Sequence, residues 1–349
     1  MPTTQGDEMP GSNKSIVCRQ PNDLALVTRP PAVRGQGEVR LKIARVGICG
    51  TDYHIYEGRQ PFLEYPRVLG HELAARVAES PGGSRFANGQ LVVVNPYVAC
   101  GRCHACRKGL PNACMRIGVL GVHRDGGMCE EICLPEENLI SADGLSPDEA
   151  ASVEFLAIGA HAVRRSGLKP GERALIVGAG PIGLGVALFA KVAGGDVTAL
   201  DRDASRLAIA HDAAKVDRTL LAEGDVGAMV AAATQGDGYD VVFDATGSRA
   251  SMEASFAFCA HGGRYVMVGL VKEAISFFDP EFHNREMTLL ASRNATLEDF
   301  STVIEAIKAG RAPIDKLITH RTTLDAVAAD LPHWARDKQG LVKAMVTVE

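Results

Sequence analysis

The sequence predicts an α/β-plus-β protein, in which an irregular, mostly antiparallel β domain is combined with a doubly wound domain built on a parallel sheet. Three observations lead to this prediction. The chain has 349 residues, which is too long for one ordinary core and suits two domains. Short β-type runs broken by Gly and Pro fill the segment from about Ser15 to Leu139. After Ser146, strands and helices alternate at the spacing of βαβ units.

The first half of the chain carries the signals of an antiparallel β domain. The expected strands are Val39–Val46, Glu72–Glu79 and Leu91–Val94, and the expected turns are Pro81-Gly82-Gly83 and Asn88-Gly89. Residues 1–14 are polar and lack the apolar core of a signal peptide, so we expect them to form a disordered tail.

The second half opens on a helix start at Ser146-Pro147-Asp148-Glu149, with Ser146 as the expected cap. The elements expected after it are the strand Ala174–Val177, the helix Pro181–Ala193, the strand Val197–Leu200, the helix Asp203–Ala213, the strand Val241–Ala245, the helix Ser248–Ala260 and a last strand, Gly263–Val268. The uncharged run from Ala174 to Ala190 is short and glycine-rich for a membrane span, and we interpret it as a buried strand and helix.

Composition narrows the class of protein and the compartment. A net charge of −5 gives no electrostatic reason to expect nucleic acid or an anionic membrane as partner. Without a signal peptide or a membrane span, a cytoplasmic location is expected. The nine cysteines are not expected to form disulfides there, and an odd number argues against a complete disulfide framework. Clustered cysteines are therefore interpreted first as metal ligands.

A glycine-rich turn predicts a dinucleotide site. The strand Ala174–Val177 runs into Gly178-Ala179-Gly180-Pro181-Ile182-Gly183, which opens a helix. Gly178 permits the tight turn, Gly180 lets the backbone approach a pyrophosphate, and Gly183 lets the helix pack close to the strand. The pyrophosphate is favoured by the free N–H groups at the helix N-terminus.

A carboxylate at the end of the next strand predicts the cofactor. Asp201 follows Gly178 by 23 residues, where it can bond the ribose hydroxyls and repel a 2′-phosphate. NAD is therefore favoured over NADP, although Arg202 and Arg206 soften that repulsion. The segments expected to pass along the rest of the cofactor are Thr246-Gly247 and Val268-Gly269-Leu270.

Two groups of residues predict metal sites. The cysteines of a C-x2-C-x2-C-x7-C array suit a closed tetrahedral zinc site, with an iron–sulfur cluster as the alternative; they are Cys100, Cys103, Cys106 and Cys114. The second group is dispersed, with Cys49 in Gly47–Asp52 and His71 in Gly70-His71-Glu72. A thiolate and an imidazole begin the open shell of a catalytic zinc, but for an isolated Cys and His buried packing is the more common explanation.

Taken in order, these motifs resemble the zinc-containing medium-chain alcohol dehydrogenase family. The resemblance covers essentially the whole chain after the tail. It implies a GroES-like catalytic domain formed by residues 15–155 and 295–349, with a Rossmann NAD-binding domain at residues 156–294.

The resemblance also implies roles for single residues. It makes Cys49 and His71 ligands of a catalytic zinc and places the third ligand at Glu154, as in the sorbitol-dehydrogenase-like branch. Glu72 then alternates as a ligand or acts from the second shell, and Asp52 holds the His71 ring. Counted with a structural zinc on the four cysteines, two zinc ions per chain are expected. Phe155, where that branch often has Pro, departs from its pattern.

Within the family, the likeness is greatest to bacterial sugar-acid 5-dehydrogenases that act on L-galactonate or L-gulonate. The segments that carry it are Gln60-Pro61-Phe62, Tyr65–Glu72, Pro96–Cys100, Asp279–His283, Ser292–Thr296 and Thr319-His320-Arg321. The implied reaction is oxidation of a secondary hydroxyl to a ketone by hydride transfer to the nicotinamide.

For that reaction, Thr51 is expected to accept the hydroxyl proton and His54 to pass it to solvent. The cationic candidates for a substrate carboxylate are His123, Arg124 and Arg293. The resemblance further implies a homodimer or homotetramer, with a small polyol or sugar acid as the other partner. The alternatives are a polyol or threonine-type dehydrogenase and, in another class, a non-catalytic NAD(H)-binding sensor.

Overall fold

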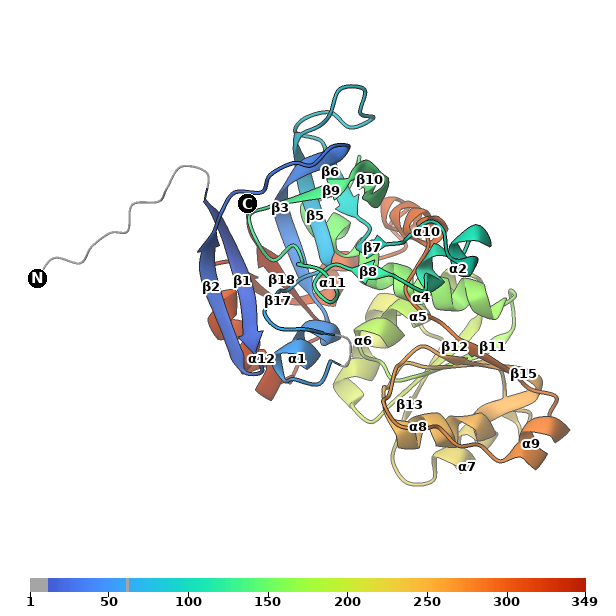
Figure 1. The fold of residues 1–349 in the computed structure, drawn as a ribbon. Helices are drawn as coiled ribbons and strands as arrows, with labels where there is room; N and C mark the ends of the chain where they lie inside the picture. Colours follow the sequence, from blue (N-terminus) through green and yellow to red (C-terminus); the bar gives the residue numbers. More distant parts are fainter. Residues whose placement is uncertain (1–11, 61–62) are drawn as a thin grey trace, which may run out of the picture. The chain divides into compact units, whose positions relative to one another are not determined.

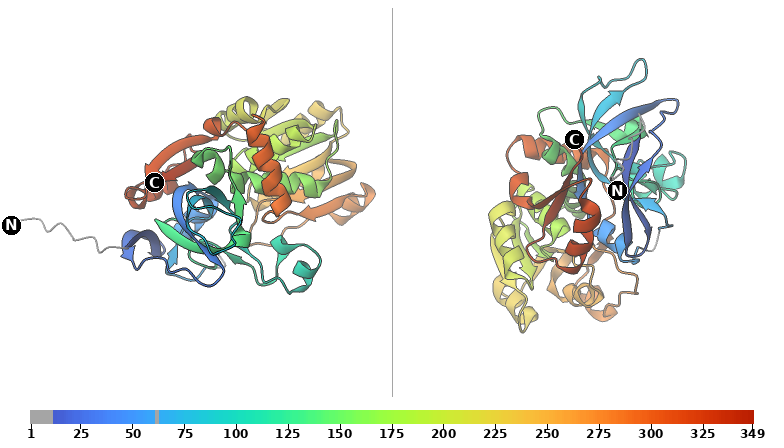
Figure 2. Two further views of the ribbon diagram at one scale, coloured as in Figure 1. Left: turned by 90° about the horizontal axis from the view of Figure 1, so that it is seen from above. Right: turned by 90° about the vertical axis from the view of Figure 1, so that its left-hand side faces the viewer.

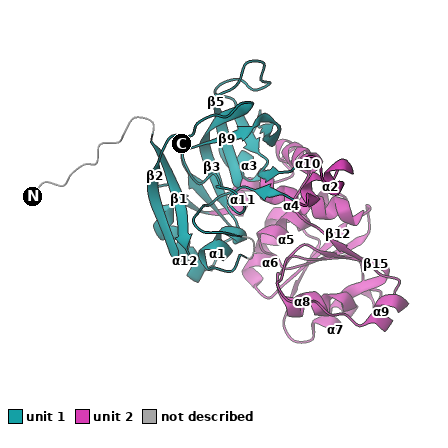
Figure 3. Ribbon diagram, in the orientation of Figure 1, with its two compact units in different colours: residues 1–100, 116–152, 320–349 teal, residues 101–115, 153–319 magenta. Residues whose placement is uncertain are grey.

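The protein consists of two compact units, one of which is interrupted twice in the sequence. A computed structural model describes residues 12–60 and 63–349. The first unit contains the described residues of Met1–Cys100, Arg116–Ser152 and His320–Glu349, and the second contains Gly101–Met115 and Val153–Thr319 (Figure 3). The predicted combination of a β domain with a parallel-sheet α/β domain is confirmed. The domain limits implied by the family resemblance stay a prediction, since these units are defined by internal packing.

The first unit is built from antiparallel β structure (Figure 1). Its largest sheet has the order β10 (Leu139–Ser141), β6 (Leu91–Val94), β5 (Glu72–Glu79), β3 (Glu38–Ile48), β18 (Lys343–Thr347) and β17 (Ile318–Thr323), and β9 (Glu131–Pro135) also pairs with β3. A smaller sheet has the order β2 (Asp23–Arg29), β1 (Asn13–Gln20) and β4 (Arg67–Val68), and β7 (Tyr97–Val98) pairs with β8 (Gly118–Val119). The helical elements of this unit are α1 (Gly50–Tyr56), η2 (Glu136–Asn138), α3 (Pro147–Ala151) and α12 (Val327–Arg336).

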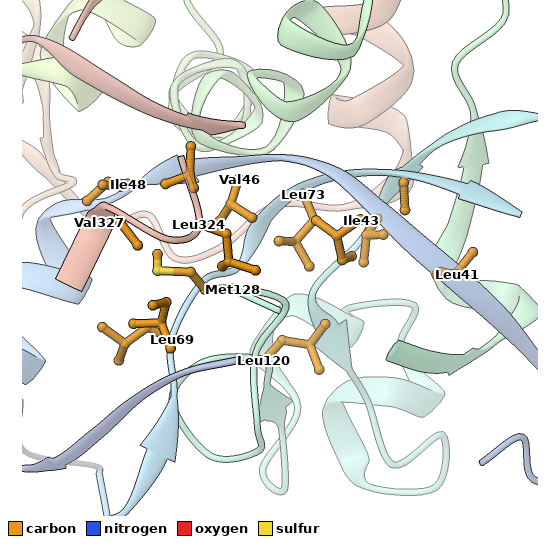
Figure 4. Packing of buried hydrophobic residues seen from close by; sticks show 14 of the residues in the cluster. Leu41, Ile43, Val46, Ile48, Leu69, Leu73, Leu120, Met128, Leu324 and Val327 are labelled. Carbon is orange, nitrogen blue, oxygen red and sulfur yellow. The ribbon is translucent and has the colours of Figure 1, made fainter. Parts of the chain in front are cut away.

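The hydrophobic core of this unit is organised around β3, which has neighbours on both sides. Leu41 and Ile43 are buried in alternation with polar residues, as expected of a strand with one buried face. The pairing register with β5 then shifts between Ile43 and Arg45, so the buried positions continue at Val46 and Ile48. Figure 4 shows these four side chains gathered in one cluster with those of other elements: Leu69, Leu73, Leu120, Met128, Leu324 and Val327.

The start of the chain corrects one expectation. β1 begins at Asn13, inside the predicted tail of residues 1–14, and residues 1–11 lie outside the described part of the chain. The Asn13 side chain donates to the Glu131 carbonyl (2.8 Å) and accepts from the amides of Glu130 and Glu131 (3.1 Å each). These tertiary bonds order a polar segment that has no apolar signal of its own.

The second unit is a doubly wound α/β structure. Its parallel sheet has the order β13 (Arg218–Leu221), β12 (Asp196–Asp201), β11 (Arg173–Val177), β14 (Tyr239–Asp244), β15 (Cys259–Met267) and β16 (Thr288–Ala291), the 3-2-1-4-5-6 arrangement of dinucleotide-binding folds. The helices are α4 (Val153–Ser166), α5 (Pro181–Val192), α6 (Ala204–Ala214), α7 (Val226–Thr234), α8 (Arg249–Ala254), α9 (Asp279–Asn284), α10 (Leu297–Lys308) and α11 (Ile314–Leu317). The four-cysteine segment adds α2 (His104–Arg107) and η1 (Pro111–Ala113).

Most of the predicted elements are present, and two need correction. The expected helix Ser248–Ala260 is α8 followed by the 3-10 helix η3 (Ser255–Phe258), and β15 already begins at Cys259. Phe256 and Phe258, both in η3, are buried in the hydrophobic core of this unit, and Cys259 then pairs with Tyr239 of β14. The strand expected to be last, Gly263–Val268, is not at the edge, because β16 pairs with β15.

Helix α4 packs closely on its neighbours. Its glycine, Gly159, is buried against α5, where an added Cβ would lie 2.4 Å from the carbonyl carbon of Gly185. It also contacts α10, the orange-red helix that is prominent in the left view of Figure 2. The absence of a side chain at position 159 therefore sets how close α4 and α5 can approach.

The predicted cap at Ser146 is confirmed at the N-terminus of α3. Ser146 Oγ accepts from the Glu149 amide (3.3 Å), and the Glu149 carboxylate accepts from the Ser146 amide (2.7 Å).

Within residues 12–60 and 63–349, no helix is long and apolar enough to cross a membrane.

Replacing Gly159 with Ala is expected to destabilise the second unit by about 1–3 kcal/mol, because backbone atoms of α5 must move to admit the methyl group. Guanidinium unfolding followed by circular dichroism measures the change. Gly82→Ala is the control, since a Cβ at Gly82 meets nothing within 4 Å. Equal midpoints for the two variants would contradict the expected helix–helix contact.

Candidate active site, metal centres and cofactor site

A buried carboxylate joins the two turns that carry the dispersed metal-ligand candidates. Asp52 lies in the first turn of α1 and accepts a hydrogen bond from the Cys49 amide (2.8 Å) and another from the Gly70 amide (3.2 Å). Burial raises the pKa of Asp52, although the nearby His71 and both backbone bonds act in the opposite direction. The carboxylate thereby fixes the backbone beside Cys49 and beside His71. The predicted bond from Asp52 to the His71 ring itself stays a prediction.

The turn before β5 depends on glycine. Gly70 has a φ of +90°, and an added Cβ would lie 2.9 Å from Val46 and 3.0 Å from the Met128 amide. A side chain at this position would be strained both by its backbone conformation and by its neighbours. The chain can therefore turn directly from β4 into β5 and place His71 and Glu72, both buried, at the strand start.

The fold brings three candidate ligands together. One ligand atom each from Cys49, His71 and Glu72 lies within 4.8 Å of the other two. A sulfur, an imidazole nitrogen and a carboxylate oxygen are the donor types that zinc accepts, and three protein ligands leave a fourth position open. The donor set therefore fits a catalytic zinc ion.

Sequence reasoning missed the residue that pairs with Glu72. Lys343, on β18, places its Nζ 2.6 Å and 2.7 Å from the two Glu72 carboxylate oxygens. The sequence signal that could have found it is a lysine inside an otherwise apolar run, Leu341–Val346, which is typical of a buried strand. A charged residue in such a position is almost always paired.

The other predicted site residues occupy varied environments. Glu154 is buried near the start of α4, in the second unit, and its role as zinc ligand stays a prediction. Thr51 is half-buried and His54 exposed, both on α1. The candidates for a substrate carboxylate are all exposed: His123, Arg124 and Arg293.

The four-cysteine segment forms a second group of converging ligands. The sulfur atoms of Cys100, Cys103, Cys106 and Cys114 all lie within 4.8 Å of one another. Cys103 Sγ is 3.4 Å from Cys106 Sγ and 3.9 Å from Cys114 Sγ, far beyond a disulfide bond. Four sulfurs held about 2.3 Å from one ion in a tetrahedron stand about 3.8 Å apart, so the geometry fits a single zinc ion.

Asn112 attaches this segment to the rest of the second unit. Its Nδ2 donates to the Arg293 carbonyl (3.1 Å) and lies 3.2 Å from His161 Nε2. Since a carbonyl only accepts, the atom between them is the amide nitrogen, and His161 Nε2 accepts as well. The proton of His161 is then on Nδ1, which lies 2.9 Å from Asp299 Oδ2.

Asp299 is the anionic centre of that attachment. Arg164 Nε donates to Asp299 Oδ1 (2.7 Å), and the Thr296 amide donates to Oδ2 (2.8 Å). Burial by itself would raise the pKa of Asp299, but the bonds from His161, Arg164 and Thr296 outweigh it and hold that pKa well below its usual range.

The glycine-rich turn has the geometry that the sequence predicted. Gly178 has a φ of +93°, and an added Cβ at Gly183 would lie 1.7 Å from the Gly178 carbonyl oxygen. Gly180 caps α5, with Pro181 in the first helical turn, followed by Ile182. A Cβ built at Gly180 meets no atom closer than Arg206 Nη1, at 3.9 Å, so the backbone there is open to a ligand.

Carboxylates at the ends of β12 and β14 shape the loops around this turn. Asp201 accepts from the amides of Ala179 (2.6 Å) and Asp203 (2.9 Å), while the neighbouring Arg202 is exposed. Asp244 accepts from the Thr246 hydroxyl at 2.7 Å. The segment Val268-Gly269-Leu270 follows β15, with Leu270 exposed.

Two family models match the chain, one in each half of the sequence. Residues 35–144 match the model described as the alcohol dehydrogenase GroES-like domain. Residues 181–309 match the model described as zinc-binding dehydrogenase.

Individual relatives match over nearly their whole lengths. The L-galactonate-5-dehydrogenase of Escherichia coli strain K12 is 42% identical over 337 residues, which cover 95% of this chain and 98% of the relative. The structure of the alcohol dehydrogenase rspB from Escherichia coli CFT073, complexed with NADH, has a TM-score of 0.90 and 30% identity, and the match covers 97% of this chain and 100% of that one. A zinc-binding dehydrogenase from Sinorhizobium meliloti 1021, bound to NADP, has a TM-score of 0.89 and 28% identity, with 96% and 99% covered.

Asp299→Asn is expected to destabilise the protein near neutral pH by about 3–5 kcal/mol, because a buried ionic network loses its anion. The folded-state pKa of Asp299 is depressed, so its contribution is present above the unfolded-state pKa of about 4 and is lost as the pH falls. The difference in denaturant midpoint between wild type and variant should therefore shrink from about pH 7 to about pH 3.

The matched control is Glu298→Gln, which removes an exposed carboxylate 3.2 Å from the same Arg164. An exposed pair contributes little, so this variant should unfold like the wild type. A constant difference between wild type and Asp299→Asn across the pH range would contradict the assignment.

Proposed function

The chain belongs to the zinc-containing medium-chain alcohol dehydrogenase family, and from that premise we propose that it oxidises a secondary hydroxyl of a sugar acid, of the L-galactonate or L-gulonate type, to the keto acid with NAD as hydride acceptor. The observation that carries the proposal is the 42% identity to an L-galactonate-5-dehydrogenase over 95% of this chain, together with the convergence of Cys49, His71 and Glu72. A non-catalytic protein that only bound NAD(H) as a sensor would not need these three converging ligands.

Two zinc ions per chain are part of the proposal. Cys49 and His71 would hold the catalytic ion, with Glu154 as third ligand and Glu72 beside it, and the four cysteines would hold the structural ion. Zinc supplies Lewis acidity that lowers the pKa of a hydroxyl group. Buried Asp52 bonds both the Cys49 turn and the turn before His71, and would hold these two ligands in one arrangement for the ion.

Helix α1 offers a route for the hydroxyl proton. Thr51 is half-buried on α1, two residues after Cys49, and its hydroxyl would accept the substrate proton, which is the role that the family resemblance implies. His54 lies on the same short helix but is exposed, and its ring can pass the proton to water. The helix thus links the buried site to solvent within four residues.

The second unit supplies the cofactor site. The open backbone at Gly180 and the N-terminus of α5 suit a pyrophosphate, and Asp201 is placed at the strand end where ribose hydroxyls bind. Bound NAD accepts the hydride. Arg206 lies near Gly180, so an additional phosphate is not strongly repelled, and NAD over NADP remains part of the proposal.

A sugar acid needs a cation for its carboxylate. Arg293 is exposed, and its backbone is fixed by the bond from Asn112. We assign it as the contributor, with His123 and Arg124 as the other candidates. A small polyol is the alternative substrate class and a homodimer or homotetramer the proposed assembly.

Purified enzyme should reduce NAD with L-galactonate or L-gulonate and should not do so with sorbitol or galactitol. Absorbance of NADH in a screen of aldonic acids and polyols measures this directly, and NADP in parallel tests the cofactor. Activity on the neutral polyols alone would overturn the sugar-acid assignment while leaving the family assignment intact.

Arg293→Ala refines that screen. Loss of a charged hydrogen bond should lower kcat/KM for the acid by roughly 10- to 100-fold, the equivalent of about 1.5–3 kcal/mol. The same variant should leave kcat/KM for a neutral polyol analogue nearly unchanged. An equal effect on both substrates would show that Arg293 does not recognise the carboxylate.

Metal analysis of the purified protein should find about two zinc ions per chain, and the His71→Asn variant about one. Removing one imidazole opens only the catalytic site, because four thiolates hold the other ion. Circular dichroism serves as the folding control. An unchanged zinc content in the variant would contradict the assignment of His71 as a ligand.

A further inference from the structure

The ion pair of Lys343 with Glu72 is unusually deep. The exposed fraction of the Lys343 side chain is 1% and that of Glu72 is 0%. Lys343 Nζ also lies 3.2 Å from the Ile48 carbonyl oxygen, so it is held by three acceptor atoms. The pair lies inside the sheet of the first unit.

The sheet topology creates the space for this pair. β3 lies between β18 and β5, and Gly47 of β3 is opposite both Met345 and Glu72. A Cβ at Gly47 would lie 2.1 Å from Glu72 Oε2. The missing side chain at position 47 thus leaves room for the carboxylate, and Lys343 reaches it across the strand.

The contribution of the Lys343–Glu72 ion pair to folding stability does not by itself explain why two charges are buried here. Both charges lose hydration when they are buried, and well-packed apolar residues often stabilise a fold at least as well as a buried ion pair. This carboxylate, however, is also one of the three converging metal-ligand candidates. Lys343 and a zinc ion therefore attract the same anion.

We propose that Lys343 is a positioning residue of the catalytic metal site, which holds the Glu72 carboxylate and so limits how tightly Glu72 binds the zinc ion. The proposal rests on the catalytic zinc of the proposed function. In the resting state the Glu72 carboxylate is shared between Lys343 and the zinc ion, while Cys49 and His71 are the firm ligands. Lys343 also offsets the negative charge that Cys49, Asp52 and Glu72 bring together.

Zinc release provides the test. Lys343→Met removes the competing cation, so Glu72 is left with zinc alone to balance its charge. The variant should lose catalytic-site zinc to a chromogenic chelator about tenfold more slowly than the wild type, in the range by which partners of metal ligands change affinity. The His71→Asn protein identifies the phase that belongs to this site, because it keeps only the four-cysteine ion.

Companion variants separate positioning from a general effect on the fold. Lys343→Met/Glu72→Gln should abolish the slowing, and Lys343→Arg should release zinc at close to the wild-type rate. In the cobalt(II)-substituted protein, Lys343→Met should change the visible absorption as the added carboxylate raises the coordination number. Lys308→Met, at an exposed position on α10, is the control and should match the wild type. If Lys343→Met does not fold, Lys343→Gln removes the charge while keeping a donor and should act in the same direction.

The outcomes are distinct. Wild-type zinc release by Lys343→Met or Lys343→Gln, or slowing that persists in the double variant, would overturn the role of Lys343 and leave the proposed function in place. A wild-type protein that holds only the four-cysteine zinc would overturn both. Slower release that depends on Glu72, with an altered cobalt spectrum, supports the proposal.

Discussion

The metal-ligand group depends on one buried carboxylate. Asp52 accepts bonds from the amide of Cys49 and from that of Gly70, which is 18 residues beyond Asp52 in the chain, and so fixes two separate turns. Neither turn is regular secondary structure, and without a shared acceptor their amides would be left unsatisfied in the interior. The convergence of Cys49, His71 and Glu72 follows from this tie, because each ligand is adjacent to a bonded turn or begins the next strand.

Carboxylates that accept hydrogen bonds from loop amides also occur in the parallel-sheet unit. Asp201 and Asp244 lie at the carboxyl ends of β12 and β14, and each accepts from amides of the loops that follow or adjoin the strand. These are the loops next to the glycine-rich turn. Acceptor-only side chains at strand ends thus order irregular backbone where ligands bind in such sheets. The turn also depends on close backbone contact between Gly183 and Gly178, which leaves no room for a side chain at position 183.

Two buried anions with cationic partners, Asp299 and Glu72, are balanced in different ways. Asp299 is surrounded by His161 and Arg164 and joins the four-cysteine segment to its own unit through Asn112. Glu72 has Lys343, but it also faces the other metal-ligand candidates. The first arrangement is satisfied within the protein and serves packing. In the second arrangement the Glu72 carboxylate can bind either Lys343 or a metal ion. This suits a metal site whose ligands exchange.

The sequence by itself determined the two fold classes, the glycine-rich turn and the four-cysteine group, because each is specified by residues close together in the chain. Strand periodicity and the cap at Ser146 are local in the same way. Tertiary structure alone decided that β1 begins at Asn13 and that β16 pairs with β15 at the edge of the sheet. It also decided that Lys343 pairs with Glu72, 271 residues away in the chain. Cys49 and His71 lie between these cases: their motifs are visible, but their proximity requires a fold that brings β3 and β5 together. Long-range pairing of this kind has no periodic signal, since it depends on which surfaces meet once the sheets have formed.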